Sequence, residues 1–157
     1  MGDYQEIMNT IARLFAAADR CDWETIQGLM TDPVHLDYSS MGRGDPADIS
    51  PKAVTDGWAT VLPGYDAMHH QIGSQIVEIY GDTALALCHG TATHFMAGQP
   101  GGETAWIIGT YRIKLVCEAA AWKISSFTFL FKFRTGDPNL ADEAAKRVAA
   151  NQMRPPS

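Results

Sequence analysis

The hydrophobic period of the chain changes at Pro63-Gly64, from helical spacing before this dipeptide to strand alternation after it. Upstream, apolar residues recur every three or four positions; downstream they alternate over long stretches, which is typical of strands. Pro and Gly together mark the break between the two patterns. Helices followed by consecutive strands predict an α+β domain, with helices packed on one face of a curved, mostly antiparallel sheet.

Capping and turn residues predict where the elements begin and end. Before the break, the pattern predicts helices over 4–20, from the N-cap Asp22 to Asp32-Pro33, and from Ser50-Pro51 to about Val61, with a short strand Val34–Tyr38 and a loop over 39–49. After the break, it predicts strands over 70–80, 82–97, 103–117 and 121–134, and a helix over 140–150.

Length and composition indicate a single globular domain over 1–157, with a core over 4–134 and a C-terminal helix and tail over 138–157. The net charge is −6, and Lys and Arg form no cluster, which argues against a nucleic-acid surface. No apolar run is long enough to span a membrane, and the N-terminus lacks signal-peptide features. The three cysteines are odd in number and widely spaced, which favours reduced thiols in a cytoplasmic protein.

Asp19 stands out because it lies on the face of the first helix that should be buried. It follows Phe15 by four positions and Ile11 by eight, so it shares their face. A buried carboxylate requires a partner. His70 and His94 are candidates, whereas a cap or salt bridge at the helix end is the simpler alternative for Asp19 alone.

The strand over 82–97 carries small residues on one face. These are Ala84, Ala86, Cys88, Gly90 and Ala92, followed by His94. Two interpretations remain open: the row leaves space for a pocket that includes Cys88, or bulky helix residues pack onto it.

Phe127, Phe129, Phe131 and Phe133 occupy one face of the last strand at period two, either in the core or on a subunit interface.

Several short segments together resemble the SnoaL-like branch of the nuclear transport factor 2 superfamily, and within it scytalone dehydratase and its bacterial relatives. In chain order they are Asp19-x-x-Asp22-Trp23, Asp37-Tyr38-Ser39-Ser40, Met68-His69-His70, Ala92-Thr93-His94 and Ala121-Trp122-Lys123-Ile124. The resemblance covers roughly residues 4–134. It implies a cone, in which a curved sheet wraps around an apolar pocket that N-terminal helices close.

The resemblance also implies roles for particular residues. His70 matches the family's catalytic histidine, Asp19 the acid that hydrogen-bonds it, Tyr38 a tyrosine that polarises the substrate carbonyl, and His94 a second pocket histidine. The sequence departs from the family where substrate is positioned. Ala18 replaces a tyrosine, and Gly109 and Tyr111 fall near the family's pocket serine and asparagine.

The residues and the resemblance together predict a cofactor-independent acid–base enzyme. A dehydratase (a lyase), a cyclase or an isomerase is expected, acting on a small hydrophobic oxygenated ring compound of polyketide or terpenoid type through an Asp19–His70 pair. The alternative is a non-catalytic carrier or a protein-interaction module. No metal is expected, and no GxGxxG, P-loop, HExxH or GxSxG motif indicates a cofactor.

The remaining candidates are given structural roles. On a strand only one of two adjacent histidines faces inward, so His69 is expected to be exposed. The tryptophans are interpreted as core or interface residues, and Arg43-Gly44-Asp45 as a coincidence in a loop. A sheet face without covering helices predicts a homo-oligomer, with a trimer preferred over a dimer by resemblance.

Overall fold

The structure is a computed structural model that describes residues 2–152. Its helices are α1 (Asp3–Asp19), α2 (Trp23–Gly28), α3 (Pro51–Ala59) and α4 (Leu140–Ala149), with 3₁₀ turns η1 (Ser39–Met41) and η2 (Leu62–Gly64). Its strands are β1 (Met30–Asp37), β2 (Ala47–Ile49), β3 (Ala67–Tyr80), β4 (Thr83–Phe95), β5 (Thr104–Glu118) and β6 (Ala121–Gly136). The predicted α+β class is confirmed.

The strands form one sheet in the order β2-β1-β6-β5-β4-β3. The predicted meander of four long strands, β3 to β6, is antiparallel throughout, whereas β1 joins β6 in parallel. The prediction of an uninterrupted loop over 39–49 is wrong. This segment contains η1 and β2, whose Ile49 pairs with Val34 of β1. A strand of three residues is too short to show alternation in the sequence.

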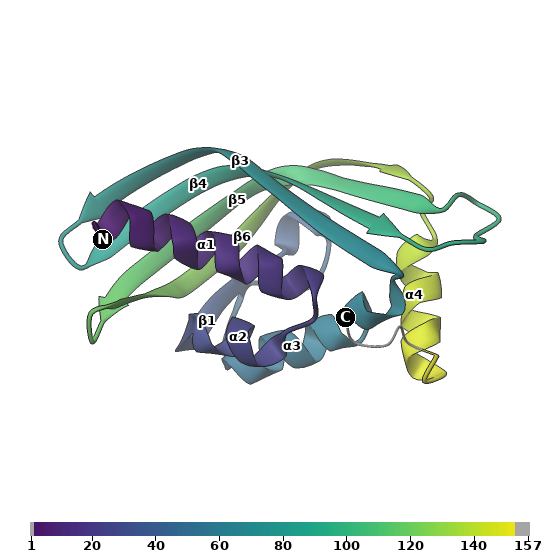
Figure 1. Ribbon diagram of the computed structural model, residues 1–157, viewed down its shortest axis with the longest axis horizontal. Helices are drawn as coiled ribbons and strands as arrows, with labels where there is room; N and C mark the ends of the chain where they lie inside the picture. Colours follow the sequence, from purple (N-terminus) through teal and green to yellow (C-terminus); the bar gives the residue numbers. More distant parts are fainter. Residues whose placement is uncertain (1, 153–157) are drawn as a thin grey trace.

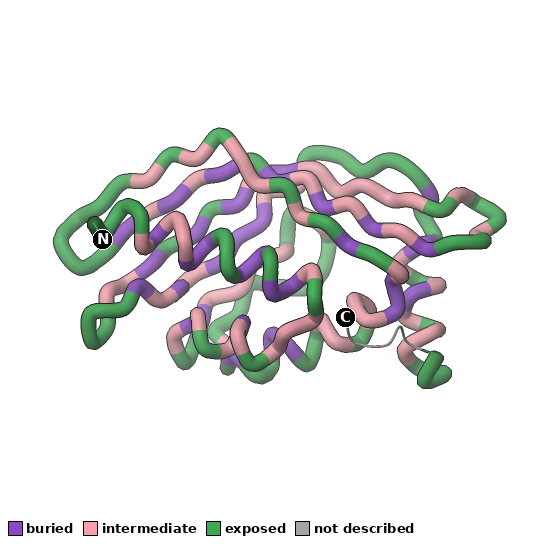
Figure 2. The backbone as a smooth tube through the Cα atoms, viewed as in Figure 1, coloured by how far each residue is buried: buried purple, intermediate pink, exposed green. Residues whose placement is uncertain are grey.

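Helices α1, α2 and α3 lie on the concave side of the curved sheet (Figure 1). Buried residues concentrate along the strands and on the side of α1 that faces them (Figure 2). The predicted caps are present: the Asp22 side chain accepts a hydrogen bond from the Thr25 N–H, and that of Ser50 accepts one from the Ala53 N–H. Such a cap typically stabilises a helix by about 1 kcal/mol. Among the described residues, no helix is both long and apolar enough to span a membrane.

A β-bulge divides the aromatic run of β6 between the two faces of the sheet. The pairing of β5 with β6 shifts between Ile108 and Gly109, so Phe131 lies opposite Gly109 but Phe133 lies opposite Ile108. Phe127 and Phe129 are buried, whereas Phe133 is 55% exposed. The prediction that all four phenylalanines share one face is therefore wrong, because one extra residue reverses the alternation.

The C-terminal helix α4 closes one end of the molecule against η2. Leu140 and Ala144 are fully buried, and the backbone of Ala144 lies where a Cβ atom on Gly64 would be. The Arg147 guanidinium bonds both the Gly64 carbonyl and the Asp66 carboxylate. The tail beyond residue 152 lies outside the described residues.

Candidate active site

Asp19 and His70 form a direct pair at the end of α1. The Asp19 Oδ1 lies 2.6 Å from the His70 Nδ1, and the backbone N–H of His70 donates to both carboxylate oxygens, at 3.2 and 3.1 Å. The helix delivers Asp19 to β3 because Asp19 continues the buried face that contains Ile11 and Phe15. The carboxylate is therefore fixed against both the ring and the backbone of one residue.

This contact defines the tautomer of His70. A carboxylate only accepts hydrogen bonds, so the Nδ1 of His70 carries a proton, and in the neutral ring the Nε2 is the nitrogen with the free lone pair. His70 has a side-chain exposure of 13%, against 75% for His69, whose Nδ1 is 3.9 Å from Asp19. The expectation that His70 faces inward and His69 faces solvent is confirmed.

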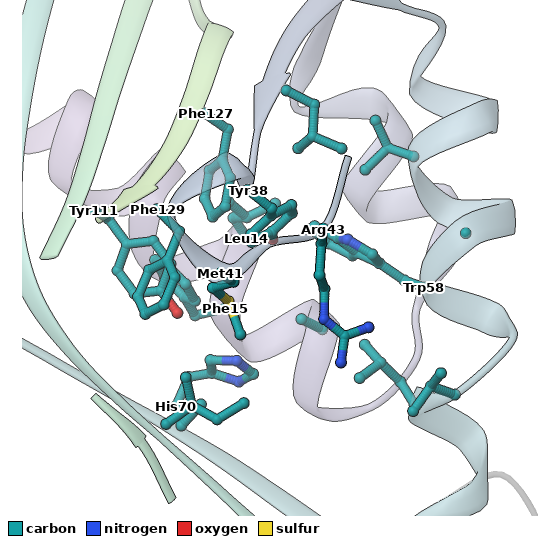
Figure 3. A pocket seen from close by; sticks show the side chains of 18 of the residues that line it. Leu14, Phe15, Tyr38, Met41, Arg43, Trp58, His70, Tyr111, Phe127 and Phe129 are labelled. Carbon is teal, nitrogen blue, oxygen red and sulfur yellow. The ribbon is translucent and has the colours of Figure 1, made fainter. Parts of the chain in front are cut away.

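A cavity of about 380 Å³ lies beside this pair, between the concave side of the sheet and α1, α3 and η1 (Figure 3). Its wall is mostly aromatic: the ring of Tyr111 lies 4.7 Å from that of Phe15 and 4.8 Å from that of Phe129, centroid to centroid. His70 and His94 line the same cavity, with their rings edge to face at 6.2 Å. The space is thus apolar, with two imidazoles at one side.

His94 is 5% exposed, and its Nδ1 has no hydrogen-bond partner within residues 2–152. Burial, with a smaller contribution from the nearby His70, lowers its pKa from 6.5 to about 4. The ring is therefore neutral at pH 7. Buried polar atoms are nearly always paired. The unpaired Nδ1 of His94 is an exception, and it is available to a ligand bound in the cavity.

The tyrosines of the cavity stay protonated. Burial raises the pKa of Tyr38 and Tyr111 far above 10, and that of Tyr65 to about 12. The indole of Trp58 hydrogen-bonds Tyr38. Since indole is only a donor, the Tyr38 hydroxyl remains able to donate its own proton to a ligand.

Six of the eight predicted site residues meet here. Ala18, Tyr38, His70, His94 and Tyr111 line the cavity, and Asp19 lies behind His70.

Gly109 and Cys88 do not line the cavity, which corrects the prediction for both. A Cβ on Gly109 would lie 2.4 Å from the Phe129 ring, so this glycine makes room for an aromatic side chain. Cys88 is buried within the core, and burial raises the pKa of its thiol to about 11. Among residues 2–152, no three His, Cys, Asp or Glu side chains are grouped as a metal site requires.

A family model for the SnoaL-like domain matches residues 1–128 of the sequence. The chain belongs to the SnoaL-like domain family. Among curated proteins, none matches this SnoaL-like chain.

Solved structures agree with this assignment. A Kribbella flavida protein, Kfla4162, superposes with a TM-score of 0.81 and 24% identity, over 89% of this chain and 97% of its own. Hexachlorocyclohexane dehydrochlorinase LinA-type3 from Novosphingobium barchaimii gives 0.72 and 14%, over 85% and 88%. A Novosphingobium aromaticivorans protein with the provisional name scytalone dehydratase gives 0.73 and 14%, over 85% and 87%. At these identities the likeness establishes the fold, and the predicted NTF2-like cone is confirmed.

Among the residues of this SnoaL-like cavity that were not predicted from the sequence, three carry a polar group. Trp58, interpreted as core or interface, lines the cavity from α3; Arg43, interpreted as part of a coincidental tripeptide, and Tyr65 line it too. Trp58 lies four positions after Val54, so helical spacing alone placed it on the inward face of α3. Neither Arg43 nor Tyr65 carried such a signal, because both lie in irregular segments.

Proposed function

We propose that this protein is a cofactor-independent acid–base enzyme, a dehydratase, cyclase or isomerase, that acts on a small, largely apolar oxygenated ring compound of polyketide or terpenoid type. One observation carries the proposal. The Nδ1 of His70 is held by Asp19 at 2.6 Å, which leaves the Nε2 as the free nitrogen of a ring that lines an apolar cavity. A histidine in this arrangement is suited to general base catalysis.

In the proposed reaction, His70 Nε2 removes a proton from a carbon next to a carbonyl. The C–H electron pair moves onto the carbonyl oxygen and forms an enolate, while Asp19 stabilises the resulting imidazolium. A positioned base of this kind contributes about 10²- to 10⁴-fold to the rate. In an elimination, the enolate then expels a β-hydroxyl group, which leaves as water with the proton from His70.

The enolate oxygen requires donors at the side of the cavity. Tyr38 is suited to this because its buried hydroxyl keeps its proton. The neutral His94 uses its ring N–H on the backbone of Ala105, so its unpartnered Nδ1 is an acceptor, suited to a hydroxyl group of the substrate. Donors that are fixed before reaction, in a site that excludes water, stabilise developing charge most effectively. Tyr38 is therefore proposed as the group that polarises the carbonyl, and His94 as the acceptor that orients a substrate hydroxyl.

The test uses two ring ketones in D₂O. 1-Tetralone reports proton abstraction by exchange of its α-hydrogens, followed by NMR, and 3-hydroxy-1-tetralone reports elimination by release of 1-naphthol and water. Wild type should accelerate at least one of these reactions and His70→Ala should not. The matched control is His69→Ala, which removes the adjacent exposed ring and should keep the wild-type rate. Equal rates in wild type and His70→Ala would overturn the proposal.

The second candidate is a carrier of small apolar molecules, which the enclosed aromatic cavity also favours. A carrier would bind both tetralones without converting either, and His70→Ala would change only the affinity. A protein-interaction module would bind neither ketone.

We also propose that the chain forms a homo-oligomer in the cytoplasm, with a trimer preferred by family resemblance. The convex side of the sheet presents Ile76, 59% exposed, and Phe133, 55% exposed, together with the half-buried Leu87. Large apolar side chains gathered on one face favour association. Sedimentation equilibrium at micromolar concentration should give a multiple of 17.1 kDa, and a mass near 17.1 kDa itself would contradict this.

A further inference from the structure

Arg43 brings a positive charge to an otherwise apolar cavity. It lies in the loop between η1 and β2 and lines the cavity together with His70, and Figure 3 shows both side chains entering the same space. The residue as a whole is exposed, which places it at the mouth of the cavity. A cation at this position is solvated when the site is empty and available to any ligand that enters.

The backbone around Arg43 is held in place. Gly42 and Gly44 on either side have φ angles of 70° and 75°, a left-handed conformation that favours glycine. The preceding 3₁₀ turn is tied to the last strand, because Ser40 Oγ accepts the N–H of Phe131 at 2.9 Å. Two turns that only glycine adopts easily, next to an anchored segment, direct one long cationic side chain over the cavity.

No acidic side chain within residues 2–152 forms an ion pair with Arg43. By contrast, Arg147 bonds Asp66 at 2.7 Å, and Arg20 lies 3.9 Å from Asp22. The groups that sense the Arg43 charge are tyrosines. Burial, which raises the pKa of Tyr38 and Tyr65, is opposed in both by Arg43. The guanidinium thus favours an anionic oxygen in this part of the cavity.

We propose that Arg43 binds a carboxylate of the substrate, so that the enzyme acts on a ring compound that is also an organic anion. This inference names the substrate class for the active site and rests on the proposed function. A planar guanidinium binds a carboxylate through two parallel hydrogen bonds, which fixes orientation as well as affinity. The apolar ring then fills the aromatic part of the cavity, with its acidic C–H directed to His70.

The experiment compares two probes of nearly equal shape, naphthalene-2-carboxylate and naphthalene-2-carboxamide, by isothermal titration calorimetry at pH 8. Wild type should prefer the carboxylate, and Arg43→Gln should weaken its binding about 10- to 100-fold, as expected for losing hydrogen bonds to a charged group. Binding of the carboxamide should change less than threefold. Arg43→Lys, which keeps the charge but loses the paired geometry, should recover part of the preference.

Two controls keep the inference separate from the proposed function. Arg134→Gln removes the same charge from an exposed position of β6 outside the cavity and should leave both affinities unchanged. His70→Ala should keep the preference for the carboxylate while it loses conversion of the tetralones. If wild type prefers the carboxylate but converts neither tetralone, the carboxylate site stands and the enzyme proposal fails. If wild type binds both probes equally, or Arg43→Gln keeps the preference, the inference is wrong.

Discussion

The two halves of β4 carry the same kind of side chain on the same face, yet one half lies in solid core and the other borders a cavity. Ala84, Ala86 and Cys88 belong to the main core cluster, together with Ile7 and Ile11 of α1. Ala92 and His94 line the cavity instead. A row of small residues therefore does not create a pocket by itself. Whether the row lies in core or borders a cavity depends on the element that covers it, because aliphatic side chains of α1 fill the space above one half of β4.

The largest effect should come from Asp19 and His70, which lie beside the half of β4 that borders the cavity. Asp19→Asn and His70→Ala should each lower the rate of tetralone conversion by about 10²- to 10⁴-fold, because an amide neither stabilises an imidazolium nor imposes the same tautomer. Residues that act as a unit are non-additive. Rates measured for both single variants and the double variant check this, and the double variant should be little slower than His70→Ala. If the rate loss of the double variant equals the product of the two single losses, the two side chains act independently.

The next effect concerns stability at low pH. Native His94 has a pKa of about 4 against an ordinary 6.5, so between these values the unfolded chain binds a proton that the native chain does not. Stability should therefore fall as the pH drops through this window, by up to about 3 kcal/mol for His94 alone. Urea unfolding at pH 7 and 4.5 should show a smaller loss in His94→Gln than in wild type.

The same strand offers a matched control for that experiment. His89 lies on the opposite, exposed face of β4, so His89→Gln should lose stability with pH as wild type does. If His94→Gln and wild type lose equal stability between pH 7 and 4.5, His94 is not the buried neutral group described above.

A single substitution made in both halves of β4 tests the comparison itself. Ala86→Leu places two branches into close-packed core and should destabilise the protein by about 1–3 kcal/mol. Ala92→Leu extends into the cavity and should cost less than about 1 kcal/mol, because the space is already there. Urea unfolding and naphthalene-2-carboxamide binding check both. Only Ala92→Leu should weaken binding of the carboxamide. Equal losses of unfolding free energy in the two variants would mean that the two halves of β4 are packed alike.

The smallest effect concerns the helix caps near the half of β4 that borders the cavity. Ser50 caps α3, which carries Trp58, whereas Asp22 caps α2, which contributes nothing to the cavity among the described residues. Removing either cap, as Ser50→Ala or Asp22→Ala, should cost about 1 kcal/mol in unfolding free energy. Calorimetry with the carboxamide probe should detect weaker binding in Ser50→Ala alone. Weaker binding in Asp22→Ala to the same degree would mean that the caps act on global stability only.

The fold was largely predictable because its signals are local. Helical spacing, caps at Asp22 and Ser50, and long alternating strands each follow from neighbouring residues. The short β2 and the bulge beside Gly109 were not predictable, because tertiary pairing determines them. The same division holds for the site. Asp19 was found as a charge on an apolar helix face, whereas Arg43 is brought to the cavity by a glycine-flanked loop that shows no periodicity.

The most direct test of the account is the tautomer of His70, measured by long-range ¹H–¹⁵N NMR of the ¹⁵N-labelled protein at pH 8. His70 should be protonated on Nδ1 with an unprotonated Nε2, and Asp19→Asn should change this spectrum while His69→Ala should not. A His70 ring protonated on Nε2 in the wild-type protein would contradict the account, because the nitrogen proposed as the base would then have no lone pair to accept a proton.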